Sequence, residues 1–332
     1  MLTSELDYAL PESLIAQRPA DPRDSSRLMV VDVKNRGISH HTFRDLPSFL
    51  QPGDALVLNE AKVLPARLVV RKDTGGEVEL LFLRDTGAGW EVLVRPSKRL
   101  KPGTILSVGG EKIEAVEDLG GGHWIVRAED VAGILEKSGR MPLPPYIHPT
   151  EDAERAYQTV YARNPGSAAA PTAGFHFTEE VLAEAGEAGA DIARVTLHVG
   201  TGTFAPVRAE KLEEHQMHAE RYAVPVETAQ LVEGAERLVA VGTTVARTLE
   251  SFAESGDAEG ESRLFVYPGY RWQVVDVLLT NFHLPRSTLL ALVMSFGGVD
   301  LVREAYRIAV EERYRFYSFG DAMLLVGGGR SL

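Results

Sequence analysis

The chain has 332 residues, of which 44% are hydrophobic and 25% are charged, so it is long enough for two domains and has a globular composition. It contains no cysteine, which excludes disulfides, thiolate chemistry, iron–sulfur clusters and Cys-ligated zinc. No apolar run is long enough to span a bilayer, and the N-terminus lacks the pattern of a secretory signal. The formal net charge of −12 argues against a nucleic-acid partner, although a local basic face within residues 1–150 stays open. We expect the protein to be cytoplasmic.

A small β domain is suggested within the first 150 residues. Apolar strands are also expected at 28–33 and 55–58, and these could belong to either domain. From 59 to 127 short apolar segments alternate with turns rich in Gly, Asp and Pro, which is typical of an antiparallel barrel or sandwich. The expected strands here are 64–70, 77–83, 90–94, 104–108 and 123–127. The simplest arrangement is an inserted small antiparallel β-barrel domain, 59–150, within an α/β domain formed by 1–58 and 151–332.

Strands and helices alternate in the remainder. Thr178 is a predicted N-cap, and a strand follows at 191–199. A strand over 238–241 leads through a glycine into a helix over 243–255. Ser287 and Asp300 are predicted to cap two further helices, the second over 301–314. The pattern predicts an α/β domain with helices on a mixed sheet.

Two Gly- and Thr-rich segments could hold a ligand. Residues 169–177 place small residues and His176 ahead of a helix whose free amides favour an anion, although a tight turn with packed aromatic residues also explains them. Residues 195–204 end a strand in the sequence GTGTF, at the position where open α/β sheets bind ligands. This segment matches neither the dinucleotide fingerprint nor a Walker motif.

A third segment, 240–251, turns from a strand through Gly242 into a helix. Its first turn holds Thr243 and Thr244, which suits an anion or a hydroxyl group. Further along the same helix, Arg247 and Glu250 have i,i+3 spacing. An ion pair between them would explain both residues without a role in ligand binding.

Three segments carry groups for proton transfer. His215, His218 and Glu220 are close in sequence, and the two imidazoles share a face if the segment is helical. Acid–base catalysis, a metal site and a solvated helix all remain open. Asn281 and His283 follow a strand, where ligand recognition is favoured over packing. Asp321, after a glycine, is either a turn-former or a site carboxylate.

Five of the nine histidines fall in these segments, and in a parallel sheet the loops would meet at one edge. They are His176, His198, His215, His218 and His283. This pattern predicts an acid–base enzyme that uses neither a thiol nor a metal.

These motifs together resemble the S-adenosylmethionine:tRNA ribosyltransferase-isomerase family of queuosine biosynthesis. The resemblance covers nearly the whole chain. Beyond the segments above it includes DYALP at 7–11, LIAQ at 14–17, SRL at 26–28, the stretch 53–59, PAR at 65–67 and YQTVYA at 157–162. The chain departs from the family pattern at Ala61, Ala219 and Val245, and the last two departures put hydroxyl roles at those positions in doubt.

The resemblance implies an α/β domain with a small β-barrel and a transferase that needs no metal. S-adenosylmethionine is the implied co-substrate, and its ribosyl moiety is transferred and isomerised. The acceptor is tRNA carrying 7-aminomethyl-7-deazaguanine at the wobble position, and the products are epoxyqueuosine-tRNA, adenine and methionine. No membrane is implied, and a monomer is expected.

Site residues follow from the resemblance as expectations. His218 or Glu220 acts as the base with His215 in support, and His176 and His198 act on the ribose or adenine; Asp321 completes the catalytic set. The expected contacts to S-adenosylmethionine are Thr172, Gly174, Gly242, Thr243, Thr244, Arg247, Asn281 and His283. Arg27, Arg67 and Arg95 are the expected contacts to tRNA phosphates.

Two other functions stay open on the sequence. A noncatalytic tRNA- or nucleotide-binding protein could share the scaffold, but the histidines and the aspartate argue for catalysis. An S-adenosylmethionine-dependent methyltransferase would carry a glycine-rich loop after its first strand and an acidic residue after its second, and that pairing is not found.

Overall fold

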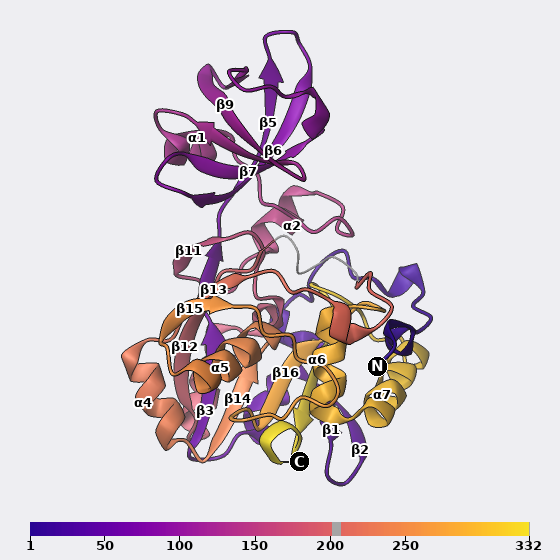
Figure 1. The fold of residues 1–332 in the computed structure, drawn as a ribbon. Helices are drawn as coiled ribbons and strands as arrows, with labels where there is room; N and C mark the ends of the chain where they lie inside the picture. The colour runs from indigo at the N-terminus through magenta and orange to yellow at the C-terminus, as the bar shows by residue number, and fades with distance from the viewer. Residues whose placement is uncertain (201–206, 332) are drawn as a thin grey trace. The chain divides into compact units, whose positions relative to one another are not determined.

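A computed structural model describes residues 1–200 and 207–331, and these residues form two compact units (Figure 1). The α/β unit contains Met1–Ala61, Pro145–Asn164 and Ala170–Leu332. The barrel unit contains Lys62–Pro144 and Pro165–Ala169. Strands β4 (Ala61–Val63) and β11 (Asn164–Ser167) pair where the chain passes from one unit to the other.

A nine-stranded mixed sheet forms the α/β unit, which confirms the predicted fold class (Figure 1). Its strands β12, β3, β14 and β16 are parallel neighbours, β17 and β1 are also parallel, and the other pairs are antiparallel. The order across the sheet is β15 (Glu259–Ser262), β13 (Glu220–Ala223), β12 (Asp191–Leu197), β3 (Asp54–Asn59), β14 (Arg237–Val241), β16 (Val277–Asn281), β17 (Ala322–Val326), β1 (Arg27–Asp32) and β2 (Gly37–Thr42).

The central strands are almost entirely buried because helical elements cover both of their faces. Strands β3, β14 and β16 are continuous apolar runs, as expected for strands enclosed on two sides. The 3-10 helix η4 (Phe43–Phe49) and α3 (Glu179–Glu187) supply Phe43 and Val181 to a core shared with Leu56. Helix α5 (Thr243–Ser255) contacts β12, β3, β14 and β16.

Side-chain caps start two of the predicted helices. Thr178 Oγ1 accepts the Val181 N–H at the start of α3, and Ser287 Oγ accepts the Leu290 N–H at the start of α6 (Thr288–Gly297). The prediction that Asp300 is a cap is wrong, because α7 (Val299–Glu311) is capped by Gly298. Among the described residues, no helix is long and apolar enough to cross a membrane.

Several helical elements of the α/β unit were not expected from the sequence. They are η1 (Thr3–Leu6), η2 (Glu12–Leu14), η3 (Arg23–Ser25), α2 (Glu151–Ala156), η6 (Thr172–His176), η8 (Leu212–Glu214), α4 (Val226–Gly234) and η9 (Gly329–Ser331). Apart from α4, all of them are six residues or shorter, so the sequence offers little periodicity by which to recognise them.

A closed antiparallel barrel forms the other unit. Its strands, in order around the barrel, are β10 (His123–Arg127), β7 (Trp90–Arg95), β6 (Glu77–Asp85), β5 (Arg67–Lys72), β8 (Ile105–Val108) and β9 (Glu111–Gly120). Residues alternate between buried and exposed along β5 and β6, as a closed barrel requires. Beyond the strands, the unit contains η5 (Ser97–Arg99) and α1 (Val131–Ser138), and α1 adds Ile134 and Leu135 to the barrel core.

Candidate functional site

The four parallel strands end at one edge of the α/β sheet, and the predicted ligand-binding segments follow them there. Gly242 follows β14, His198 follows β12, and Asn281 is the last residue of β16. The carboxyl edge of parallel strands is the common ligand-binding position in open α/β sheets. Two neighbouring pockets of the α/β unit contain residues of these segments.

The first pocket, here called the threonine pocket, is lined by most of the residues predicted to contact S-adenosylmethionine. Hydroxyl, amide and imidazole groups supply its polar surface, and none of the described lining residues is Lys, Arg, Asp or Glu. The lining residues are Ala170, Pro171, Thr172, Ala173, Val199, Gly242, Thr243, Thr244, Thr280, Asn281, His283 and Leu289.

The chain enters α5 through a glycine because the turn is left-handed. Gly242 has φ 95°, and a Cβ there would lie 3.4 Å from the Cβ of Ala173. Asn59, at the end of β3, donates from Nδ2 to Thr244 Oγ1 (3.3 Å) and to the Leu197 carbonyl (3.1 Å). Asn59 was not among the predicted site residues, because a single polar residue ending a strand carries no motif.

A hydrogen-bonded chain runs from the threonine pocket into the core. Thr172 Oγ1 donates to Asn281 Oδ1 (3.0 Å), and Asn281 Nδ2 donates to His176 Nε2 (3.1 Å). The other ring nitrogen, Nδ1, therefore carries the proton and donates to Ser26 Oγ at 2.8 Å. His176 stacks on Phe43 and does not line the pocket, so it lies behind Asn281.

Burial keeps two histidines of this region neutral. It lowers the pKa of His176 to about 4, against an opposing effect of Asp321, and lowers the pKa of His283 to about 3. His283 Nε2 pairs with Thr280 Oγ1 at 2.7 Å. Both rings thus act as neutral hydrogen-bonding groups near pH 7.

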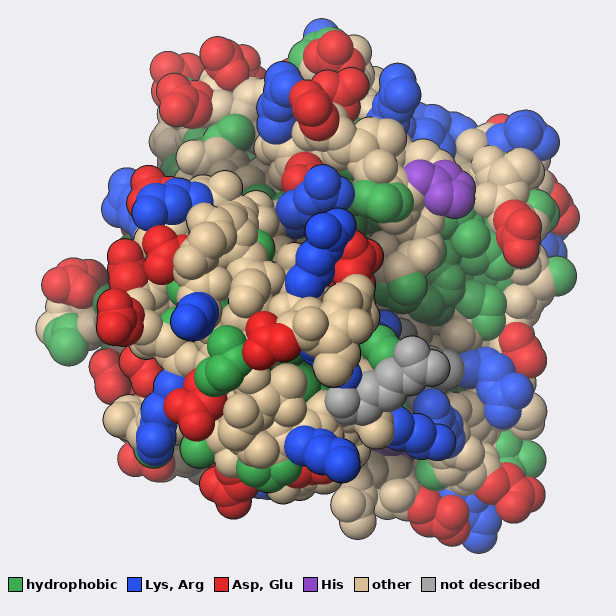
Figure 2. All heavy atoms as spheres, turned by 90° about the horizontal axis from the view of Figure 1, so that it is seen from above, with side chains coloured by type: hydrophobic (Ala, Val, Ile, Leu, Met, Phe, Trp, Pro, Cys, Tyr) green, Lys and Arg blue, Asp and Glu red, His purple; other side chains and the backbone are tan. Residues whose placement is uncertain are grey.

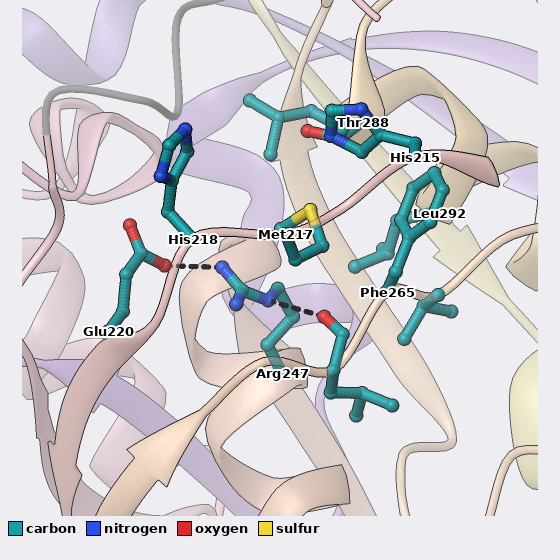
Figure 3. A pocket seen from close by; sticks show the side chains of 11 residues that line it. His215, Met217, His218, Glu220, Arg247, Phe265, Thr288 and Leu292 are labelled. Carbon is teal, nitrogen blue, oxygen red and sulfur yellow. Dashed lines mark hydrogen bonds and ion pairs between the residues drawn. The ribbon is translucent and has the colours of Figure 1, made fainter. Parts of the chain in front are cut away.

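The second pocket, here called the arginine pocket, contains the predicted base residues (Figure 3). It shares Leu289 with the threonine pocket, so the two adjoin. Its lining is His215, Met217, His218, Glu220, Arg247, Leu264, Phe265, Val266, Thr288, Leu289 and Leu292. Burial lowers the pKa of His215, and the nearby His218 lowers it further.

The possibility that His215 and His218 share a helical face is wrong. Helix η8 ends at Glu214, and the chain continues without regular structure until β13 begins at Glu220. His218 is exposed, whereas Glu220 is buried. The imidazoles and the carboxylate still line one pocket, because the irregular segment that carries His215 and His218 leads directly into β13, which begins with Glu220.

A buried ion pair crosses the arginine pocket. Arg247 Nη1 donates to Glu220 Oε2 and Arg247 Nε donates to the Leu264 carbonyl at 3.1 Å (Figure 3). Each of the paired side chains is only 4% exposed. Within the described residues, the buried Nη2 of Arg247 has no hydrogen-bond partner. Glu220 Oε1 accepts the Gly200 N–H at 2.9 Å.

The predicted pair of Arg247 with Glu250 is therefore wrong. Glu250 is fully buried and accepts the backbone N–H groups of Gln273, Val274 and Val275 at 2.8 to 3.1 Å. Tyr270 OH also donates to this carboxylate at 3.0 Å. To pair with Arg247, three residues earlier on α5, Glu250 would have to give up these partners, which come from the loop before β16.

Three further predicted site residues line neither pocket. Asp321 is buried and pairs with Arg315 at 2.8 Å, a structural role that fits its turn. Gly174 packs so closely that a Cβ would lie 2.0 Å from Tyr161 OH. His198 is half-buried, and burial lowers its pKa.

Some of the predictions fall outside the described residues. Positions 201–206, which contain most of the GTGTF sequence, are among them. Within 1–200 and 207–331, no three His, Asp or Glu side chains gather as metal ligands would. The requirement for a metal therefore stays a matter of prediction.

The arginines predicted to contact tRNA differ in their surroundings. Arg27 lies over the Tyr314 ring, 3.6 Å from its centroid, and donates to the Glu312 carbonyl. Arg67 donates to the Leu143 carbonyl at 3.2 Å, whereas Arg95 is exposed. On the face drawn in Figure 2, basic and acidic side chains are interspersed rather than gathered by sign.

The geometry defines an α/β protein with two adjoining pockets in its α/β unit and a closed barrel as its second unit. A family model described as queuosine biosynthesis protein matches residues 3–325. The chain belongs to this family.

Curated relatives are similar over their full lengths. A protein of Rubrobacter xylanophilus is 72% identical, with 100% of each chain covered. One of Symbiobacterium thermophilum is 51% identical over 98% of this chain and 100% of its own. Both are named S-adenosylmethionine:tRNA ribosyltransferase-isomerase. The crystal structure of S-adenosylmethionine tRNA ribosyltransferase from Thermotoga maritima matches with 39% identity and a TM-score of 0.57, covering 97% of this chain and 100% of that one.

Proposed function

We infer that the protein is an S-adenosylmethionine:tRNA ribosyltransferase-isomerase. It transfers and isomerises the ribosyl moiety of S-adenosylmethionine onto 7-aminomethyl-7-deazaguanine at the tRNA wobble position, giving epoxyqueuosine-tRNA, adenine and methionine. The observation that carries this conclusion is the similarity over essentially the full chain to relatives with that name. S-adenosylmethionine is thus a co-substrate and tRNA a partner.

Finer features of the protein are part of the proposal. We expect catalysis without a metal, in a monomer located in the cytoplasm. We also propose that 59–150 is an inserted domain and that 1–58 with 151–332 is the α/β domain. The separate apolar core of the barrel unit supports this division.

The threonine pocket is proposed as part of the S-adenosylmethionine site. Its hydroxyl and amide groups suit the ribose and the adenine edge, which are uncharged and polar. Thr172, Thr243, Thr244 and Asn281 would make these contacts. Gly174 is better explained by packing against Tyr161 than by ligand contact.

His218 is the favoured base in this proposal. The sulfonium acidifies the adjacent ribose carbon, so a nearby base can remove its proton. Both Glu220 oxygens are engaged, one by Arg247 and one by the Gly200 N–H, whereas His218 is exposed in the same pocket. His215 supports it from the same segment.

Departure of adenine would benefit from a proton donor near its ring. His176 and His283 remain neutral near pH 7, so neither is a ready proton donor there. We propose His176 as a residue that positions Asn281. His198 stays a candidate for action on the ribose or adenine. Asp321 is buried and paired with Arg315, so any part it plays in catalysis would be indirect, by holding that arginine in place.

Product analysis tests the function. Incubated with S-adenosylmethionine and tRNA carrying 7-aminomethyl-7-deazaguanine, the protein should release adenine and methionine, and should release neither with tRNA that lacks this base. Formation of S-adenosylhomocysteine instead would assign it to the methyltransferases. Absence of any product from folded protein would leave tRNA binding without catalysis.

A further inference from the structure

We propose that the two pockets divide S-adenosylmethionine between them: the arginine pocket holds the methionine part, with its carboxylate on Arg247 Nη2, and the threonine pocket holds the adenosine. This division rests on the proposed function, because it concerns how that co-substrate is bound. It assigns Arg247 as the residue that recognises the amino-acid end.

The unpaired nitrogen of Arg247 is the first observation. A guanidinium is a donor at every nitrogen and has no acceptor, and two of its nitrogens are engaged by Glu220 and the Leu264 carbonyl. The third, Nη2, is buried and has no partner within the described residues, in a side chain that lines the pocket. Leaving such a group unpaired is costly, and a ligand carboxylate would satisfy it with charge-assisted hydrogen bonds.

The surroundings of Arg247 favour an amino acid with an apolar side chain. The pocket has apolar walls, formed by Met217, Phe265 and Leu292 (Figure 3) together with Val266. These walls suit the methylene groups and the sulfur of methionine. Most ligand pockets combine such walls with a few polar anchors.

The charges of the pocket point the same way. Glu220 already balances Arg247, so a bound dianion such as phosphate would leave excess negative charge in a buried place. The amino-acid end of S-adenosylmethionine carries an ammonium beside its carboxylate. The zwitterion therefore adds no net charge to the ion pair.

The threonine pocket differs from the arginine pocket in having an uncharged polar lining, which is what the adenosine half of the ligand requires. Its described lining offers hydroxyl, amide and imidazole groups without a Lys, Arg, Asp or Glu, which fits ribose and adenine. Leu289 borders both pockets, so one ligand can extend across them. The sulfonium joins the two halves of the ligand and would lie beside Leu289, and His218 would be on the methionine side.

Binding of S-adenosylmethionine and of its decarboxylated analogue tests the division. Dissociation constants are measured for both ligands, with and without tRNA, on wild-type protein and on the double variant Glu220→Gln/Arg247→Gln. The double variant removes both charges together and leaves no buried charge unpaired. Wild-type protein should prefer S-adenosylmethionine by about tenfold or more, the value of a charge-assisted contact, and the double variant should lose this preference.

Two single variants are measured in the same way. Arg247→Lys keeps a positive charge opposite Glu220 but lacks the second terminal nitrogen, so it should also reduce the preference. If the double variant is misfolded, as judged by loss of cooperative unfolding, Arg247→Lys provides the test instead. Thr243→Val, in the threonine pocket, is the matched control and should weaken both ligands equally, so that their ratio is preserved.

The outcomes are distinct for the two proposals. Equal wild-type binding of the two ligands, or a preference that survives loss of Arg247, overturns the division while the function stands. Wild-type protein that binds neither ligand and releases no adenine with the modified tRNA contradicts the proposed function itself.

Discussion

His176 illustrates how a histidine can serve a site without entering it. Its ring is buried and neutral, and it receives a hydrogen bond from Asn281, whose amide faces the threonine pocket. The residue type and its neighbours predicted a functional histidine. The sequence could not show whether His176 contacts a ligand directly or positions Asn281, because this depends on the side of Asn281 on which the ring lies.

Replacing His176 should affect binding more than turnover. In His176→Leu, Asn281 loses the acceptor that orients its amide, and the KM for S-adenosylmethionine should rise about tenfold, the value of one buried hydrogen bond, with a smaller change in kcat. His176→Gln offers an amide oxygen near the Nε2 position and should restore much of the KM. Equal KM values for the two variants, at similar thermal stability, would contradict a positioning role.

The buried histidines also predict how stability depends on pH. Their folded pKa values, about 4 for His176 and about 3 for His283, lie below the unfolded value of 6.5, so the unfolded chain binds more protons between these limits. Their contribution to the unfolding free energy is complete above pH 6.5 and is lost as the pH falls. On the order of 2 kcal/mol per histidine should be lost between pH 6.5 and 5.

Denaturant titration at the two pH values measures this loss. The His176→Gln variant is the control, because it removes one of the two titrating groups and should reduce the loss of stability on acidification. A variant that loses as much stability as wild-type protein over this range would show that His176 does not titrate as described.

At the scale of the elements, α5 joins the two pockets to the body of the fold. It supplies Thr243 and Thr244 to one pocket and Arg247 to the other, while Glu250 on the same helix accepts backbone N–H groups from 273–275. The helix itself was predicted correctly, from the strand that leads into it through a glycine. The partners of its charged residues were not, because they come from segments distant in sequence.

Removing the Glu250 carboxylate should therefore destabilise the protein strongly. Glu250→Ala leaves three backbone N–H groups without their acceptor, and the unfolding free energy should fall by about 3 kcal/mol or more. Glu254→Ala is the matched control, since this exposed carboxylate on the same helix accepts a hydrogen bond from the same Tyr270, and its removal should change stability by less than about 0.5 kcal/mol. Similar losses in both variants, measured by urea unfolding, would argue against the role of Glu250.

The strands show where sequence patterns succeed. Strands β3 and β14 are apolar runs and were expected. Strand β9 was missed because only Ile113 and Ala115 are buried among its charged residues. Strand β13 and the edge strand β15 were missed as well, since both are short and mostly polar, and their pairing is decided by the neighbouring strands.

For the molecule as a whole, the acidic charge has to be reconciled with a tRNA partner. The chain carries a net charge of −12, but residues 1–150 contain 19 Lys and Arg against 21 Asp and Glu. Arg27 and Arg67 already have partners within their own units, and Arg95 is exposed. Composition could suggest a local basic surface. Only the placement of each side chain shows which of the three arginines is exposed and which are held by partners within the protein.

Arg95→Ala should weaken tRNA binding. It should also reduce the slope of log binding constant against log salt concentration by about the value of one phosphate contact. Arg307→Ala is the control, because Arg307 is held between Glu304 and Glu311 on α7 and should leave the slope unchanged. Binding constants measured across a series of salt concentrations give both slopes. An Arg95→Ala slope equal to that of wild-type protein would remove Arg95 from the tRNA surface.

The fate of the ribosyl group tests the central claim most directly. S-adenosylmethionine labelled in its ribose is incubated with the protein and with tRNA carrying 7-aminomethyl-7-deazaguanine, and label in the tRNA is measured together with free adenine and methionine. The account predicts that label enters the wobble nucleotide as epoxyqueuosine and that adenine and methionine appear in equal amounts. Modified tRNA without ribose label, with S-adenosylhomocysteine as the by-product, would contradict it.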